Sequence, residues 1–196
     1  MRRLNLGCGR DVRQGYVNLD SAKLPGVDVV HDVTKVPWPF KDGEFDEVLC
    51  RHVLEHLDDL MPVLEELSRI TKPDGRITIH VPYFASPGAF ADPTHKRFFT
   101  YQTFRYFQPG DNLEHYTKAR FRILELRLRF FTSGGLISAL SFIPDLIINA
   151  MPNIYERFCS RLFPASGRRD LPGTHLVLRA KESGSLALRF HFARRQ

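Results

Sequence analysis

Short apolar runs make up much of the first fifty residues, and each of the first three stops at glycine or aspartate. Residues 3–6 are followed by Gly7-Cys8-Gly9, residues 16–19 by Asp20, and residues 27–31 by Asp32. A fourth run covers residues 45–50. Apolar runs of about 4–8 residues bounded by glycine or polar residues are typical of buried strands. The sequence therefore predicts four strands before the first long helix.

That helix is predicted over residues 53–71, where leucines and isoleucine recur at helical spacing and form one apolar stripe. Lys72-Pro73-Asp74-Gly75 is expected to end it, and residues 76–81 form the next predicted strand. Strands joined by short loops and a crossover helix indicate a parallel sheet in an α/β domain.

After Pro82 the regular succession of apolar runs gives way to a segment rich in glycine, proline, alanine and phenylalanine. Residues 83–97 form a long predicted loop, of a length usually associated with function. Thr100 is expected to cap a short helix that carries Phe104 and Phe107, and further strands are predicted at residues 121–131 and 174–179. We expect one domain over residues 1–181, in which residues 83–165 form a substrate-side loop and helical cap, followed by a basic tail at residues 182–196.

Composition narrows the class of protein. The 196 residues are 43% hydrophobic and 26% charged, which excludes a disordered tail, a collagen-like repeat and a multi-span membrane protein. Cys8, Cys50 and Cys159 are scattered, as in a reducing compartment, and no signal peptide is visible. We therefore expect a cytoplasmic protein, with peripheral contact to a membrane left open.

The net charge of +6 is concentrated in the second half of the chain. Residues 1–98 carry 13 basic and 15 acidic side chains, whereas residues 99–196 carry 15 basic and 7 acidic ones. This asymmetry is compatible with an anionic partner or with a solvated arginine-rich face.

The glycine loop and the two aspartates predict a nucleoside site. Glycines at the end of a first strand let the backbone pass close to a ligand, and the carboxyl ends of parallel strands share one crevice. Asp20 is placed to accept the ribose hydroxyls, and Asp32 to lie near the adenine. A dinucleotide is disfavoured, because Val12 stands where the phosphate fingerprint needs glycine or alanine, and the loop is too short for the usual helix.

Several motifs together resemble the class I S-adenosylmethionine-dependent methyltransferases over residues 3–83. They are Leu4-Asn5-Leu6-Gly7-Cys8-Gly9, Gly15-Tyr16-Val17-Asn18-Leu19-Asp20, Val29-Val30-His31-Asp32, Val36-Pro37-Trp38-Pro39-Phe40, Phe45-Asp46-Glu47-Val48, His52-Val53-Leu54-Glu55-His56-Leu57 and Leu67-Ser68-Arg69-Ile70-Thr71-Lys72-Pro73-Asp74-Gly75-Arg76. The resemblance implies a Rossmann-like, mostly parallel seven-stranded sheet with helices on both faces and the last strand antiparallel. It also implies S-adenosyl-L-methionine as cofactor.

The same resemblance assigns cofactor-binding roles to Asn5, Gly7, Cys8, Gly9, Asp20, Asp32, Val33, Arg51 and His52. Gly7, Cys8 and Gly9 would pass under the amino-acid portion, while Arg51 and His52 would border the methionine part and the methyl group. Two departures from the family are visible. Asn5 replaces the usual acidic residue, and the helix after the glycine loop is nearly absent.

The segment His52-x-x-Glu55-His56 also matches the H-x-x-E-H signature of some zinc proteases, since residues four apart share a helix face. A related E-x-x-E-H holds a divalent ion in some small-RNA and quinone-precursor methyltransferases. The resemblance favours the cofactor-adjacent helix start common in the family, and we expect no metal.

The loop after residue 82 is expected to cover the methyl group. His95 is the candidate general base, because imidazole exchanges protons near neutral pH and Asp92 lies close in sequence. Tyr83 and His52 are further catalytic candidates, Tyr83 for positioning a substrate. The alternative is that His95 only pins the loop to backbone groups.

Residues 134–148 form an apolar stretch that Pro144 and Asp145 interrupt, so it is too short to span a bilayer. Core or dimer packing is the simpler interpretation. The alternative is contact with a membrane, where Arg127, Arg129, Arg157 and Arg161 would meet lipid headgroups.

The sequence thus predicts methyl transfer to an oxygen or nitrogen of a small-molecule, sugar or lipid-linked acceptor, by a monomer or homodimer. Nucleic acid is a less favoured acceptor, because no RNA-binding module is evident. A non-catalytic cofactor-binding scaffold and a zinc hydrolase are the alternatives from other classes.

Overall fold

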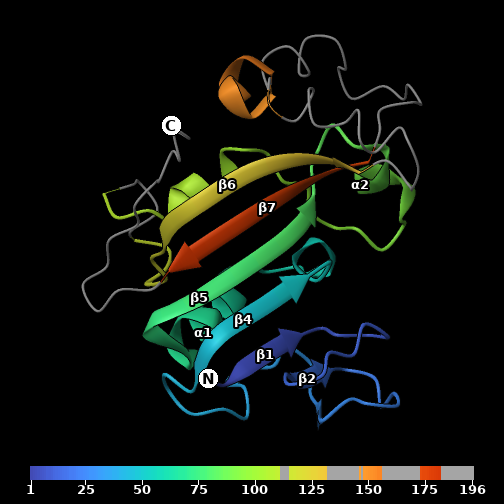
Figure 1. Ribbon diagram of the computed structural model, residues 1–196, viewed down its shortest axis with the longest axis vertical. Helices are drawn as coiled ribbons and strands as arrows, with labels where there is room; N and C mark the ends of the chain where they lie inside the picture. Colours follow the sequence, from blue (N-terminus) through green and yellow to red (C-terminus); the bar gives the residue numbers. More distant parts are fainter. Residues whose placement is uncertain (111–114, 132–145, 147, 156–172, 182–196) are drawn as a thin grey trace.

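The computed structural model describes residues 1–110, 115–131, 146, 148–155 and 173–181. They form a seven-stranded sheet in the order β3-β2-β1-β4-β5-β7-β6 (Figure 1). The strands are β1 Arg3–Leu6, β2 Val17–Asp20, β3 Val29–Val30, β4 Phe45–Arg51, β5 Thr71–Pro82, β6 Arg122–Phe131 and β7 Gly173–Lys181.

The first five strands are parallel. β1 pairs with β2 and β4, β2 with β3, and β4 with β5, all in the same direction. β7 runs antiparallel between β5 and β6. The predicted Rossmann-like, mostly parallel α/β fold is confirmed. Because the carboxyl ends of parallel strands lie at one edge, the segments that follow β1, β2 and β4 gather there (Figure 1).

The helices are short. In the described part of the chain they include η1 Leu54–His56, α1 Met61–Ile70, α2 Pro87–Ala91 and η2 Thr103–Phe107, and residues 148–150 and 152–155 are helical as well. α1 packs behind β4 and β5 through its buried stripe of Val63, Leu64, Leu67 and Ile70 (Figure 1). Within the described part of the chain, no helix has the length and apolar character needed to cross a lipid bilayer.

The helix predicted over residues 53–71 is shorter than the leucine pattern indicated. Pro62 lies in the first turn of α1. Proline has no N–H to donate and is tolerated only near a helix start, so the helix cannot extend much further toward the amino end. Leu57 and Leu60 are still buried, although they precede the helix. The apolar spacing therefore identified the buried residues correctly but placed the helix start too early.

Loops replace helices between the early strands. Residues 7–16, 21–28 and 31–44 contain turns and no helix, so the expected helices on both faces of the sheet are not met there. Buried Asn5 on β1 and Asn18 on β2 hold the first of these loops. Asn5 Nδ2 donates to Asp11 O at 2.7 Å and to Asn18 Oδ1 at 3.1 Å. Asn18 Nδ2 donates to Arg13 O, and its Oδ1 accepts from Arg13 N at 2.9 Å.

We expect Asn18→Ala to lower the free energy of unfolding by about 2 kcal/mol, since it removes the partner of the partly buried Arg13 N and Arg13 O and the buried hydrogen bond from Asn5 Nδ2. Asn153→Ala is the matched control, because Asn153 is exposed and its side chain accepts a single hydrogen bond, from Gln102. Urea unfolding of both variants measures the difference. A loss below about 0.5 kcal/mol for Asn18→Ala would show that the asparagine pair does not support the loop.

Parts of the sequence-based prediction lie outside the described residues. Most of the apolar stretch at residues 134–148 and the whole tail at residues 182–196 are among them, as are Arg157, Cys159 and Arg161.

Candidate active site

The glycine loop turns sharply at the carboxyl end of β1. Gly7 and Gly9 have positive φ angles of 62° and 49°, a conformation that side-chain-bearing residues rarely adopt. A Cβ on Gly7 would lie 2.3 Å from Val53 Cγ2, whereas a Cβ on Gly9 would meet nothing within 4 Å. Gly7 is thus required by the fold, while the space at Gly9 is open to a ligand.

Asp20, the last residue of β2, holds this loop through its carboxylate. Oδ2 accepts a hydrogen bond from Gly9 N at 2.7 Å, and Oδ1 accepts one from Ala22 N at 2.9 Å. Each carboxylate oxygen has capacity for another hydrogen bond, so the half-buried group can still accept from two ribose hydroxyls. The structure therefore brings Asp20 and the glycine loop together, as the sequence predicts.

Asp32 and Val33 follow β3 in a tight turn. Asp32 Oδ1 accepts hydrogen bonds from Thr34 N and Thr34 Oγ1, and these bonds lower the pKa of the Asp32 carboxyl group. Val33 O accepts a hydrogen bond from the indole Nε1 of buried Trp38 at 2.9 Å. This turn is fixed by its own side chains and by the loop that follows it.

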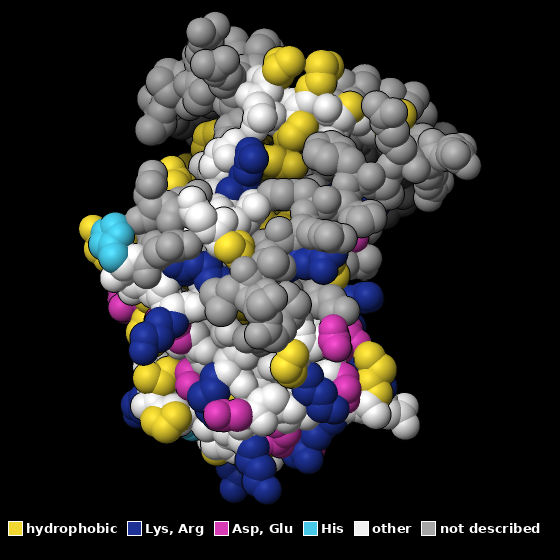
Figure 2. Space-filling view, turned by 90° about the vertical axis from the view of Figure 1, so that its left-hand side faces the viewer, with side chains coloured by type: hydrophobic (Ala, Val, Ile, Leu, Met, Phe, Trp, Pro, Cys, Tyr) yellow, Lys and Arg dark blue, Asp and Glu magenta, His cyan; other side chains and the backbone are white. Residues whose placement is uncertain are grey.

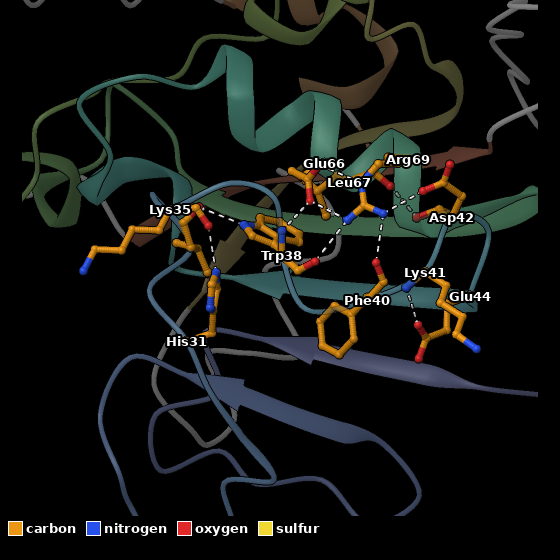
Figure 3. A network of polar contacts seen from close by, with 12 residues as sticks. His31, Lys35, Trp38, Phe40, Lys41, Asp42, Glu44, Glu66, Leu67 and Arg69 are labelled. Atoms are coloured by element: carbon orange, nitrogen blue, oxygen red, sulfur yellow. Dashed lines mark hydrogen bonds and ion pairs between the residues drawn. The ribbon is translucent and has the colours of Figure 1, made fainter.

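That loop, residues 31–44, is attached to α1 by Glu66 and Arg69 (Figure 3). Glu66 accepts from Trp38 N at 2.7 Å and pairs with both Nε and Nη2 of Arg69 at 2.7 Å. Arg69 also donates to Phe40 O and Asp42 Oδ1. The sequence analysis did not single out Glu66 or Arg69, because they appear there only as polar positions on an amphipathic helix.

Arg51 ends β4 and reaches back to the glycine loop. Its Nη1 donates to Asp11 Oδ2 at 2.9 Å, and its Nε is buried without a hydrogen-bond partner among the described residues. Cys8 is buried, and desolvation together with the nearby Asp20 charge raises the pKa of its thiol. Cys8 therefore remains a neutral thiol, and Arg51 supplies the positive charge at this edge.

Asn5 occupies a different place from the one that the resemblance implied. Its side chain is 2% exposed and donates to Asp11 O and Asn18 Oδ1 under the loop. In this structure Asn5 positions the glycine loop at the carboxyl end of β1.

The turn after β4 carries three polar side chains at the carboxyl edge of the parallel strands. His52 has a positive φ of 54°, and its Nδ1 lies 3.0 Å from Oε1 of the fully buried Glu55. His56 Nδ1 lies 2.9 Å from Thr94 Oγ1. The turn at residues 92–97 is held against η1, because Lys96 N and Arg97 N both donate to Glu55 O.

His95 is brought into this group by that turn. Its side chain is 8% exposed, its Nδ1 lies 3.0 Å from Ala89 O, and its ring contacts His56 with centroids 4.8 Å apart. The bond to Ala89 O is the backbone contact that the loop-pinning alternative anticipated. Tyr83 is fully buried, and its ring packs near Phe84 and Tyr155. In this arrangement its side chain is not exposed to a methyl-accepting substrate.

The sheet order, the glycine loop and the Asp20 carboxylate together define a class I methyltransferase fold. Residues 4–79 match the family described as methyltransferase domain. The resemblance to class I S-adenosylmethionine-dependent methyltransferases is thereby confirmed, and S-adenosyl-L-methionine is the cofactor of this class.

Solved structures share the fold over nearly the whole chain. A methyltransferase dependent on this cofactor from Archaeoglobus fulgidus is 20% identical, with a TM-score of 0.58 over 92% of this chain and 86% of that one. A putative methyltransferase, solved in complex with the Haloferax volcanii methyltransferase activator Trm112, is 16% identical, with a TM-score of 0.55 over 93% of this chain and 82% of that one. The [4+2]-cyclase SpnF is 17% identical, with a TM-score of 0.52 over 93% and 75%. No curated protein is detectably similar in sequence.

Proposed function

We propose that this protein transfers a methyl group from S-adenosylmethionine to an oxygen or nitrogen of a small-molecule, sugar or lipid-linked acceptor. The observation that carries the proposal is the contact between Asp20 and Gly9, which joins the ribose-binding carboxylate to a loop with open space above it. The cofactor carries its methyl group on a positively charged sulfur and so supplies an activated group for direct transfer.

The residues present fit this cofactor. Asp20 would hold the ribose, Asp32 and Val33 would flank the adenine, and the buried, unpartnered Nε of Arg51 would meet the carboxylate of the methionine portion. His52 would border the reacting end. Such contacts act by aligning the acceptor with the methyl group and by keeping water out.

An acceptor hydroxyl must lose a proton during transfer, whereas a neutral amine can attack without a base. Of the three catalytic candidates, Tyr83 is fully buried, which favours His52 and His95 for a role at the reacting end. Phe90, in α2, and Phe98 lie on either side of the turn that carries His95 in the chain, stack with centroids 4.5 Å apart, and are both exposed. This apolar pair supports an acceptor with an apolar portion.

Nucleic acid remains the less favoured acceptor. On the face shown in Figure 2, Lys and Arg side chains of the described residues are interspersed with Asp and Glu, so this face presents no continuous basic surface. RNA binding relies on such surfaces for contact with phosphates.

Calorimetric titration with S-adenosylmethionine and S-adenosylhomocysteine tests the cofactor. We expect micromolar binding of both, and binding of ATP at least about 100-fold weaker, because the short glycine loop offers no helix N-terminus to a phosphate. Preferential binding of ATP or a dinucleotide by the folded protein would contradict the proposal.

Transfer itself needs a separate measurement, since the [4+2]-cyclase shows that this fold is also found with another reaction. Tritiated methyl groups from the cofactor are followed into small-molecule, lipid and RNA fractions of a cell extract. We expect the label in the small-molecule or lipid fraction. Cofactor binding without any transfer would favour the non-catalytic scaffold, and label confined to RNA would favour the nucleic-acid alternative.

A further inference from the structure

Glu55, His56 and His95 converge although His95 is remote from the other two in sequence. One potential ligand atom from each side chain lies within 4.8 Å of those of the other two. The approach is fixed by the backbone, because Lys96 N at 2.8 Å and Arg97 N at 3.1 Å bind Glu55 O. The cluster is therefore part of the fold and does not depend on a chance rotamer of one exposed side chain.

Glu55 is the unusual member. Its side chain is 0% exposed, Oε1 is paired with His52 Nδ1, and Oε2 is buried with no hydrogen-bond partner among the described residues. A buried carboxylate oxygen without a partner costs free energy, and a bound cation would satisfy it. This orphaned oxygen is evidence for a ligand that is independent of the clustering itself.

The hydrogen bonds of the two histidines fix which ring nitrogen is free. A backbone carbonyl only accepts, so His95 Nδ1 carries the proton that it donates to Ala89 O. Thr94 Oγ1 donates its single proton to Asp92 Oδ1, so it must accept from His56 Nδ1. In the neutral form of both rings the lone pair is therefore on Nε2, the form in which imidazole binds a metal ion.

We propose that Glu55, His56 and His95 bind one divalent transition-metal ion. Two imidazoles and a carboxylate suit Zn²⁺ and neighbouring first-row metals, which take such donors at about 2.0–2.2 Å and keep a further coordination position open. His52 would orient the carboxylate through its bond to Oε1. Asp92, with Oδ2 3.7 Å from His95 Nε2, adds negative charge at the edge of the site.

The sequence-based expectation that no metal is bound took into account only His52, Glu55 and His56. His95 changes that interpretation, because the structure brings it next to Glu55 and His56. With a metal bound, His95 is a ligand and not a general base, because its one lone pair cannot serve both roles. An oxygen of the acceptor would take the open coordination position. That last step rests on the proposed function, whereas metal binding does not.

Metal binding is tested on the full chain after treatment with a chelator, by titration with Zn²⁺ alone and with Co²⁺ alone. We expect one equivalent per chain and a visible Co²⁺ absorption spectrum of nitrogen and oxygen ligands. Glu55→Gln and His95→Gln should each weaken binding at least about tenfold. His115→Gln is the control, because His115 is exposed and contacts Tyr116 away from the cluster.

Thermal unfolding separates a metal ligand from a structural residue. Without metal, Glu55→Gln should be as stable as the unaltered protein or more so, because the variant buries no charge. With saturating Zn²⁺ the unaltered protein should gain stability and the variant should not. Absence of saturable binding, or binding that Glu55→Gln and His95→Gln leave unchanged, would overturn the proposal, whatever the outcome of the cofactor titration.

Discussion

Asp20→Ala is expected to weaken the binding of S-adenosylhomocysteine by about 100-fold or more. Each hydrogen bond from a ribose hydroxyl to a carboxylate contributes about 1.5–3 kcal/mol, and every 1.4 kcal/mol or so is a factor of ten. The substitution also releases Gly9 N and Ala22 N, which Asp20 holds at 2.7 and 2.9 Å. Calorimetric titration of the variant with S-adenosylhomocysteine measures the loss.

Two further variants make the result interpretable. Asp20→Asn keeps one acceptor oxygen, so it should retain part of the loop geometry and show an intermediate loss of affinity. Asp46→Ala is the matched control, because Asp46 pairs with Lys72 near the amino end of β4, away from the crevice. Tight binding by a folded Asp20→Ala protein would remove Asp20 from the cofactor site and, with it, the main support for the proposed function.

Glu66→Gln is expected to lower the free energy of unfolding by about 3 kcal/mol, the usual cost of breaking a largely buried ion pair. Glu66 accepts from Trp38 N and pairs bidentately with Arg69, and these bonds hold the loop of residues 31–44 against α1 (Figure 3). The amide of glutamine would present N–H groups to the guanidinium. Trp38 is the only tryptophan in the chain, so its fluorescence reports unfolding directly.

The matched control is Asp42→Asn, which removes a second partner of the same arginine. Asp42 is 83% exposed, so solvent screens its pair with Arg69 and the expected loss is below about 1 kcal/mol. Equal losses for Asp42→Asn and Glu66→Gln would show that burial of Glu66 does not strengthen its contacts.

The same pair predicts a pH dependence. Burial alone would raise the pKa of Glu66, but hydrogen bonds from Arg69 and from Trp38 N outweigh burial and lower it below the ordinary value of 4.5. The unfolded chain therefore takes up the proton first as the pH falls. The stabilisation is present above about pH 4.5 and is lost as the pH falls through the pKa of the folded state.

The difference in stability between the unaltered protein and Glu66→Gln should accordingly shrink in acid. Taking the difference cancels the contributions of Asp32, Asp46 and Asp92, whose carboxyl pKa values are also lowered. A difference that stays constant from pH 7 to pH 3 would contradict this assignment.

Local sequence was sufficient for the parallel half of the sheet. The runs that end at Gly7, Asp20 and Asp32 contain β1, β2 and β3, because a short apolar run and a glycine or aspartate at its end are local signals. The ordered motifs were also sufficient for the family. Pro62 is a local signal for the start of α1 that the prediction from leucine spacing did not use.

The contacts among His52, Glu55, His56 and His95 could not be predicted from the local sequence. His52, Glu55 and His56 are neighbours in sequence, and that spacing suggested one helical face. The structure instead makes a 3-10 turn there, so His52 pairs with Glu55 while His56 meets His95. Asn5 likewise has the sequence position that the family uses for a cofactor-binding residue. In the structure its side chain donates hydrogen bonds to Asp11 O, in the loop after β1, and to Asn18 Oδ1.

The sequence by itself therefore determined where the early strands lie along the chain, the glycine loop, and Asp20 as the carboxylate near that loop. These features depend on residue type and short spacing. Only the tertiary structure decided which groups distant in sequence come into contact. Arg51 reaches Asp11, Glu66 holds Trp38, and His95 joins Glu55. The physical reason is that each of these contacts depends on how loops cross between strands, and periodicity carries no information about that path.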